Sequence, residues 1–223
     1  LGLVFLGITS ALFFVASLYA YGYLHREVAE ARGPRTDFVS GALFSNAPER
    51  IFVGCMLMFL AAMSLVTVSQ HMGLLWVAVE ATTLASAPLI YFHRHHRSLE
   101  ATWKYLLLCS VGIALALLGT FFLVAATGSG QTTPSLMVKD LIASAGGLQA
   151  QWLKAAFILI LVGYGTKMGL APLHSWLPDA HSESPSVVSA LMSGALLNVA
   201  FLGILRMYQV SLAAGEGAFA RSL

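Results

Sequence analysis

Long apolar stretches separated by short polar segments are the main pattern along this chain. A helix needs about 20 mostly apolar residues to cross a lipid bilayer. Six stretches are long enough, and we expect spanning helices at 1–24, 50–70, 72–93, 101–126, 152–172 and 186–210. The pattern therefore predicts an all-α fold, a polytopic membrane helix bundle.

The polar segments predict how these helices are connected. Only a tight turn near Gln70 separates the second and third spans, so these two helices should be antiparallel neighbours. Residues 25–49 form a polar loop, and residues 137–145 have a modest amphipathic pattern that favours a short surface helix. The chain starts inside an apolar stretch and ends in a tail, 211–223, so we expect a piece cut from a longer protein.

The fifth stretch contains residues that interrupt helices. Gly165 and Gly169 weaken the helix, and Pro172 lacks a backbone donor and clashes with the preceding turn. We expect one discontinuous helix, with a half-helix that ends at 167–169 and a short helical piece through Trp176. Transporters use such breaks to expose backbone groups at membrane depth. The alternative is an ordinary proline kink near the interface.

Composition supports a membrane protein. Of the 223 residues, 58% are hydrophobic and 10% are charged, whereas soluble domains carry about 25% charged residues. The net charge of +2 indicates no nucleic-acid partner. Cys55 and Cys109 both lie in apolar spans, where a cysteine is typically a small core residue rather than a disulfide or metal ligand.

The basic residues predict an orientation. One side of the membrane collects seven of them: Arg26, Arg32, Arg35, Arg50, Arg94, Arg97 and Lys104. The other side has four: Lys139, Lys154, Arg206 and Arg221. The excess favours the first side as cytoplasmic, because positively charged loops are retained there.

Two charged residues inside predicted spans are the first candidates for function. A charge at the centre of a spanning helix costs about 2.5–3.5 kcal/mol, so Lys167 and Glu80 should have a task or a partner. Glu80 lies roughly 12 Å into its span, with Trp76 and Thr83 on the same helix face. Burial disfavours both charges and mutual proximity favours them, so such a pair can exchange protons. The alternative is a static salt bridge that orders helix packing.

Other polar residues near the membrane are weaker candidates. Lys104 opens its span, where a lysine either snorkels to the headgroups or joins a relay. His174 and His181 lie just beyond the helix break, and histidine exchanges protons near neutral pH. The basic cluster 93–97 is typical of membrane boundaries, and Asn198 should face other helices. No zinc spacing, phosphate loop or nucleophile triad is present, so we expect no metal or cofactor in this chain.

Several motifs resemble one family of membrane proteins. The segment from Lys167 to Gly194, KMGLAPLHSWLPDAHSESPSVVSALMSG, resembles the antiporter-like membrane subunits. That family includes proton-pumping subunits of respiratory complex I, multisubunit sodium/proton antiporters and membrane-bound hydrogenases. WVAVE at 76–80 and KYLL from Lys104 look like the family's glutamate and lysine helices. Residues 80–100 are most similar to component F of hydrogenase-4-type complexes.

The resemblance implies a fold and a set of site residues. The family's bundle has roughly fourteen helices in two inverted five-helix repeats; here 50–210 would be the first repeat, and the second is not in this sequence. By resemblance, Glu80 and Lys167 would be the relay pair, with Lys104, His174 and His181 as further members. At Asn198 many relatives in complex I have a second lysine, and an asparagine does not release a proton in the useful range.

The resemblance also implies a function. It predicts a proton-translocating subunit of a redox-driven, hydrogenase- or complex I-like complex in a bacterial or archaeal cytoplasmic membrane, with other membrane and peripheral subunits as partners. One alternative is a sodium/proton antiporter subunit in which Thr82, Thr83 and carbonyls of the broken helix bind sodium. The other is a structural subunit with a static ion pair.

Overall fold

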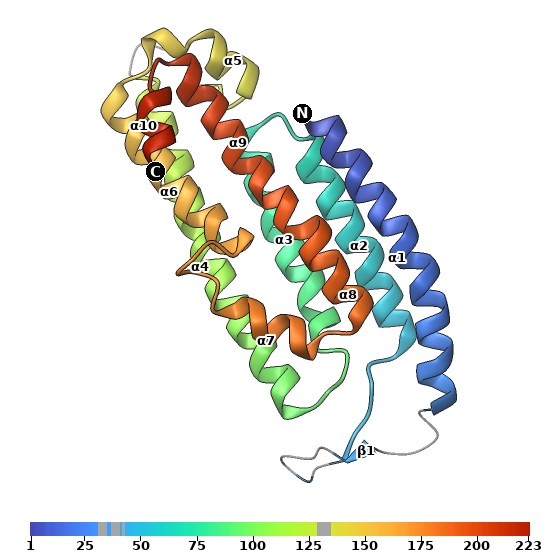
Figure 1. Ribbon diagram of the computed structural model, residues 1–223. Coiled ribbons are helices and arrows are strands. Elements are labelled where there is room, and N and C mark those ends of the chain that lie inside the picture. The colour runs from blue at the N-terminus through green and yellow to red at the C-terminus, as the bar shows by residue number, and fades with distance from the viewer. Residues whose placement is uncertain (31–34, 37–40, 42, 129–134) are drawn as a thin grey trace.

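The computed structural model describes residues 1–223 except 31–34, 37–40, 42 and 129–134. The chain forms an elongated bundle of long helices (Figure 1). The helices are α1 (Gly2–Glu30), α2 (Glu49–Val68), α3 (Met72–Ile90), α4 (His96–Ala126), α5 (Val138–Ala143), α6 (Ala150–Met168), α7 (Trp176–Glu183), α8 (Ser186–Leu191), α9 (Leu197–Ala213) and α10 (Gly217–Ser222). A 3-10 turn, η1 (Ala145–Gly147), and a π-helical segment, η2 (Met192–Leu196), complete them. Two short strands, β1 (Arg35–Thr36) and β2 (Leu43–Phe44), pair antiparallel at one end.

Five helical segments in the described part of the chain are long and apolar enough to cross a membrane. They lie in α1, α2, α3, α4 and the continuous run from α8 to α9. The sixth predicted span, 152–172, corresponds to α6, which has 19 residues and ends at Met168. Two lysines, a glutamine and two glycines lower the mean hydropathy of α6, so it is not among the five. The predicted all-helical membrane bundle is confirmed.

Some predicted boundaries differ from the observed ones. α1 continues to Glu30, because the residues after position 24 are mostly good helix formers. The predicted loop 25–49 therefore begins inside a helix. α4 begins at His96 rather than 101, since His95 and Ser98 form a reciprocal cap at its start. The predicted surface helix is α5, with Val138 and Leu141 buried.

The turn between α2 and α3 is stabilised from both sides. His71 caps α3, because its Nδ1 accepts hydrogen bonds from the backbone of Gly73 and Leu74 at 3.1 and 3.2 Å. Arg206, buried in α9, donates to the carbonyl oxygens of Val66 and Thr67 at 3.2 and 2.8 Å. These carbonyls lack partners inside α2, and so Arg206 ties α9 to the end of that helix.

Replacing Arg206 by methionine should destabilise the protein. The change keeps an apolar stem but removes two charge-assisted hydrogen bonds, which costs about 1.5–3 kcal/mol of unfolding free energy. Thermal unfolding of the purified protein in detergent measures the effect. Arg221→Met is the control, because in the part of the chain that the structure describes Arg221 donates only to Gly217 of its own short helix. Equal melting temperatures for the two variants would contradict this role of Arg206.

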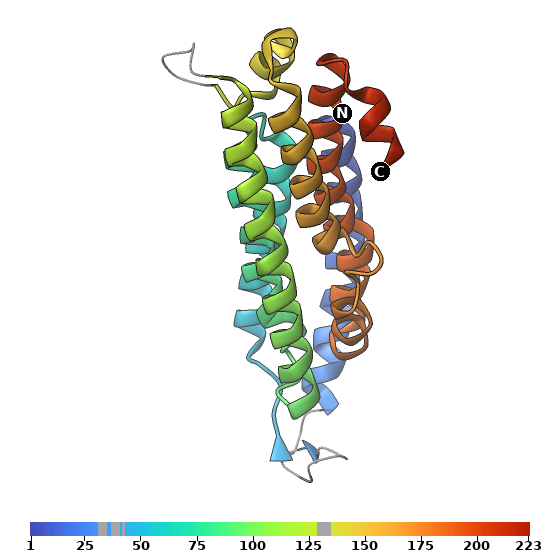
Figure 2. The ribbon, with the colours of Figure 1, turned by 90° about the vertical axis from the view of Figure 1, so that its left-hand side faces the viewer.

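Glycines bring α4 and α6 into close contact. α4 runs nearly the full length of the bundle, and α6 lies beside it (Figure 2). A β-carbon at Gly163 would lie 2.6 Å from the carbonyl oxygen of Gly112 and 2.6 Å from the backbone nitrogen of Ala116. Only glycine permits this approach, a common device in membrane helix packing. Lys167, four residues after Gly163, is on the same face of α6 and therefore points toward α4.

The predicted helix break is confirmed. α6 ends where Gly169 adopts a left-handed conformation with φ 81°, and Leu170 N–H donates to Gly165 O at 2.8 Å. The helical piece expected to run through Trp176 instead begins there as α7. The second proline of this segment, Pro178, explains the start, since a proline fits best in the first turn of a helix.

Candidate functional site

Lys167 lies at the meeting point of three helices. Its side chain, in the last turn of α6, is 0% exposed. The Nζ atom donates a hydrogen bond to Thr83 Oγ1 in α3 at 3.0 Å and another to the hydroxyl of Tyr105 in α4. It also lies 4.4 Å from the centre of the Tyr105 ring, close enough for a cation–π interaction. The buried amine is therefore held by a hydroxyl from each of two neighbouring helices.

Glu80 belongs to the same hydrogen-bonded network. Its half-buried carboxylate accepts a bond from Ser110 Oγ at 2.9 Å and a longer one from Thr83 Oγ1 at 3.4 Å. The Thr83 hydroxyl thus accepts from Lys167 and donates to Glu80. No ion pair joins Glu80 to Lys167 directly among the described residues. The two groups singled out by the sequence share one site but are bridged by a hydroxyl.

A second branch of this network leads away from Tyr105. The Tyr105 hydroxyl and Ser86 Oγ lie 2.6 Å apart, and Ser86 Oγ donates to the carbonyl of Thr82 at 2.7 Å. Tyr105, Ser86 and Thr83 are all 0% exposed. Because Tyr105 accepts from Lys167, it can donate to Ser86, and each hydroxyl then both donates and accepts. The network is consistent with a positively charged lysine.

Trp176 connects the broken helix to this site. Its indole N–H donates to the carbonyl of Thr166 at 2.9 Å, which satisfies a carbonyl at the end of α6. Its ring lies 5.0 Å from the Tyr105 ring, and the side chain is fully buried. α7 therefore touches both the residue before Lys167 and Tyr105, one of the two hydrogen-bond acceptors of Lys167.

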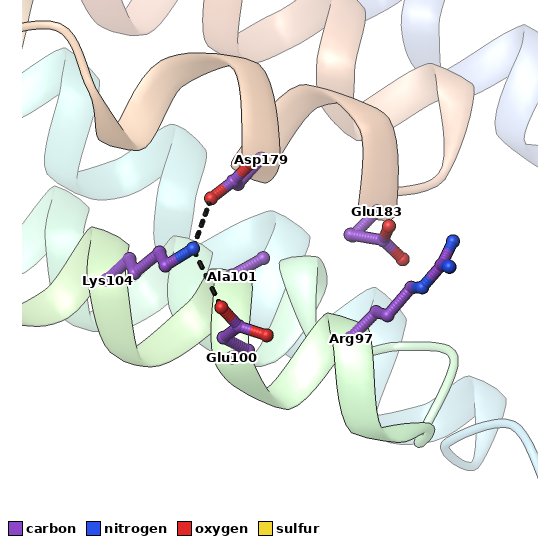
Figure 3. Close-up of a pocket in the computed structure, with 6 residues that line it drawn as sticks. All are labelled: Arg97, Glu100, Ala101, Lys104, Asp179 and Glu183. Carbon is purple, nitrogen blue, oxygen red and sulfur yellow. Dashed lines mark hydrogen bonds and ion pairs between the residues drawn. The ribbon is translucent and has the colours of Figure 1, made fainter. Parts of the chain in front are cut away.

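The other predicted site residues lie outside this network. Lys104 is at the surface, where its Nζ lies 2.8 Å from Asp179 and 2.8 Å from Glu100 (Figure 3). His174 is exposed in the turn before α7. The half-buried His181 has its Nδ1 2.6 Å from Ser189 Oγ in α8. None of these three hydrogen-bonds to Lys167, Thr83 or Glu80 in the described part of the chain.

The histidines near residue 95 have structural partners. Ser98 N–H donates to His95 Nδ1 at 3.2 Å, which caps α4, and His93 Nδ1 lies 3.0 Å from Asn46 Oδ1. Among the described residues, no three side chains of His, Cys, Asp or Glu come together as a metal site requires. These contacts hold the start of α4 and the segment that leads into α2.

Asn198 lies on the outside of the described part of the bundle. Its side chain is exposed and donates to the carbonyl of Gly194 in its own helix at 2.6 Å, so it does not face a neighbouring helix of this chain. Gly194 belongs to the π-helical segment η2, where the regular ladder of backbone hydrogen bonds is interrupted. A side-chain amide that follows such a segment readily satisfies a carbonyl left by the interruption.

Sequence reasoning missed three members of the network: Tyr105, Ser110 and Ser86. All three are polar residues inside an apolar span, a pattern that indicates a buried hydrogen-bonding role. A second signal is the spacing of Glu80, Thr83 and Ser86, which lie three residues apart and form a polar stripe along one face of α3.

The chain matches a known family over most of its length. Residues 69–219 match the family model described as NADH:quinone oxidoreductase/Mrp antiporter, transmembrane. The matched region includes every residue of the network around Lys167. The chain therefore belongs to this family, and the resemblance carried by the Lys167–Gly194 segment is confirmed. It is an integral membrane protein with several spanning helices.

Two curated relatives illustrate the range of the family. A hydrogenase-4 component F homolog from Methylacidiphilum infernorum is 38% identical over 208 residues, covering 92% of this chain and 41% of the relative. NADH-quinone oxidoreductase subunit N from Deinococcus radiodurans is 35% identical over 153 residues, covering 69% of this chain and 30% of that protein. The chain thus spans less than half the length of either relative.

Solved structures show the same fold. The membrane-bound sulfane sulfur reductase, an archaeal respiratory membrane complex, contains a chain that matches 100% of this one with a TM-score of 0.69 and 23% identity, over 31% of its own length. A chain of respiratory complex I from Thermus thermophilus matches 97% of this one with a TM-score of 0.59 and 21% identity, over 63% of its length. At these identities the comparison establishes the fold of an antiporter-like membrane subunit.

Proposed function

We propose that this chain is a proton-translocating, antiporter-like part of a redox-driven membrane complex in a bacterial or archaeal cytoplasmic membrane. The observation that carries the proposal is the buried hydrogen-bonded chain from Lys167 through Thr83 to Glu80. The names of the relatives, which include hydrogenase and NADH-quinone oxidoreductase subunits, support a redox complex as the setting. Its other subunits would be the partners, and electron transfer elsewhere in the complex would supply the driving force.

The bridging hydroxyl supplies a path for one proton. The Lys167 ammonium transfers a proton to Thr83 Oγ1 while the Thr83 hydroxyl passes its own proton to the Glu80 carboxylate. The products are a neutral amine, an unchanged threonine and a neutral carboxylic acid, so protons and charge balance. Buried charges are unfavourable, and electrostatic interactions are strong in a low-dielectric interior. A further charge that approaches the site can therefore shift the equilibrium between the charged pair and the neutral pair.

Tyr105 and Ser110 stabilise the charged starting state. Tyr105 accepts from the lysine and lies under its ammonium, while Ser110 donates to the carboxylate. Hydrogen bonds to charged groups are stronger than neutral ones and favour the ionised form.

Replacing Thr83 by valine tests the bridge. Valine has nearly the same shape but no hydroxyl, so two hydrogen bonds to charged groups are lost, and proton translocation should fall about tenfold or more. The measurement is proton uptake by the complete complex in inverted membrane vesicles, followed with a pH-sensitive dye. Thr82→Val is the matched control, because among the described residues the Thr82 hydroxyl donates only to Val79 of its own helix, at 2.6 Å. Equal uptake by both variants would contradict a relay through Thr83.

Sodium coupling is the competing function. Of the two threonines considered as sodium ligands, Thr82 directs its hydroxyl to its own helix, and only Thr83 faces the charged groups. The geometry therefore favours protons. The same vesicle assay with and without sodium separates the two functions, since a sodium antiporter requires the ion and a proton relay does not.

A further inference from the structure

α7, the helix that follows the break, is attached to α4 at two levels. At the surface, Lys104 of α4 lies 2.8 Å from Asp179 of α7 and 2.8 Å from Glu100, one turn earlier in α4 (Figure 3). The Lys104 and Asp179 side chains are 47% and 43% exposed, so this is a partly solvated ion-pair cluster. Figure 3 shows Asp179 and Glu100 on opposite sides of the same ammonium group.

The second attachment lies inside the protein and uses the next residue of α4. The Tyr105 ring is 5.0 Å from the ring of Trp176, which stands three residues before Asp179 on α7. Residues three apart on a helix share a face. Two consecutive residues of α4, Lys104 and Tyr105, therefore contact the same face of α7, one from the surface and one from the interior.

The position of α7 in turn affects the surroundings of Lys167. Trp176 donates to the carbonyl of Thr166, the residue before Lys167, and packs on Tyr105, which accepts a hydrogen bond from Lys167. A shift of α7 would disrupt the hydrogen bond from Trp176 to Thr166 and the packing of Trp176 on Tyr105, both next to the buried amine. The surface ion pair is thus linked through Trp176 to the geometry of the relay.

We propose that Lys104 is a positioning residue that fixes α7 against α4 through Asp179 and does not itself carry translocated protons. This inference rests on the proposed function. Two carboxylates in contact with one ammonium favour its charged form, which suits an attachment point better than a group that must repeatedly release its proton. The lysine identified from the sequence as a relay candidate would then act through Asp179 and Trp176.

Substitutions at Lys104 distinguish positioning from proton transfer. Lys104→Arg keeps the ion pairs but holds its proton permanently, so a positioning residue predicts proton translocation within about twofold of the natural protein. Lys104→Met removes the ion pairs that attach α7 to α4. Because a partly exposed ion pair of this kind contributes little energy, proton translocation should fall only about three- to fivefold. Asp179→Asn should cause a similar loss, and the exchanged pair Lys104→Asp with Asp179→Lys should recover most of it.

A structural readout accompanies the transport assay. Hydrogen–deuterium exchange of the α7 backbone amides in the purified complex should be faster in Lys104→Met and unchanged in Lys104→Arg. Lys154→Met is the control: it breaks an ion pair with Glu216, 3.1 Å away, that does not involve α7, so it should leave both the exchange of α7 and proton uptake unchanged.

Each outcome decides one question. If Lys104→Arg loses as much translocation as Lys104→Met or more, Lys104 carries protons and the positioning role is wrong. If Lys104→Met leaves α7 exchange or translocation unchanged, the attachment has no such role. If the complex translocates no protons at all, the proposed function fails, whereas the exchange measurement still tests whether Lys104 holds α7.

Discussion

Replacing Lys167 by glutamine should abolish proton translocation by the assembled complex. The glutamine amide can still donate hydrogen bonds to Thr83 and Tyr105, so the packing of the three helices should survive. It cannot take up or release a proton, and loss of a proton-transferring group typically lowers a rate by about 100-fold or more. Dye-monitored proton uptake by inverted vesicles measures the loss, and native gel electrophoresis of the complex measures assembly.

Two further variants serve as a control and as a test of a purely structural role for Lys167. Lys154→Gln removes the other lysine of α6, which pairs with Glu216 at the opposite end of the helix, and should leave translocation intact. Lys167→Ala, which removes the hydrogen bonds as well, separates a relay from a structural role. Failure of the complex to assemble in both Lys167 variants would favour the structural interpretation, and normal uptake by Lys167→Gln would remove Lys167 from the relay.

A side chain at Gly163 should cause a large loss of stability. Valine at this position would collide with the backbone of α4 at Gly112 and Ala116, where even a β-carbon lies 2.6 Å from each of the nearest atoms. Forced separation of packed helices typically costs about 1–3 kcal/mol and sometimes more. We therefore expect a lower melting temperature in detergent and less assembled complex in membranes.

The same substitution should also weaken the relay. Lys167 lies one turn beyond Gly163 on the face toward α4, so a wider gap would move its amine away from Tyr105. Gly54→Val is the matched control, because Gly54 lies on an exposed face of α2, where an added β-carbon would meet nothing within 4 Å. If both variants melt at the same temperature, the close approach of α4 and α6 is not required for stability.

Part of the candidate site could be predicted because membrane burial makes charges conspicuous. Glu80 and Lys167 stand out in apolar segments, and the structure brings them into one network. Lys104 was selected by the same reasoning, but a residue near the end of a span can reach the surface, and there it pairs with Asp179. A charge deep in a span therefore indicates a buried partner, whereas a charge near the end of a span can pair at the surface, as Lys104 does with Asp179.

Other members of the site could not be predicted, because they depend on how the helices are rotated and paired. Thr83 was expected to share a helix face with Glu80 and, in one alternative, to bind sodium; its role as a bridge requires α6 to place an amine beside it. Arg206 was counted among the basic residues of one membrane side, yet it caps α2 from inside the bundle. Such contacts join residues more than 80 positions apart, for which local patterns carry no information.

The sequence by itself determined the all-helical membrane fold, the approximate spans, the break after Lys167 and the family, because hydropathy, glycine and proline act locally and the motif is long. The tertiary structure alone decided that a threonine hydroxyl separates the carboxylate from the amine, that Tyr105 shares the amine, and that Lys104 is on the surface. The physical reason is that glycine contacts between α4 and α6 set the distance and rotation of these helices, and atomic contacts follow from that packing.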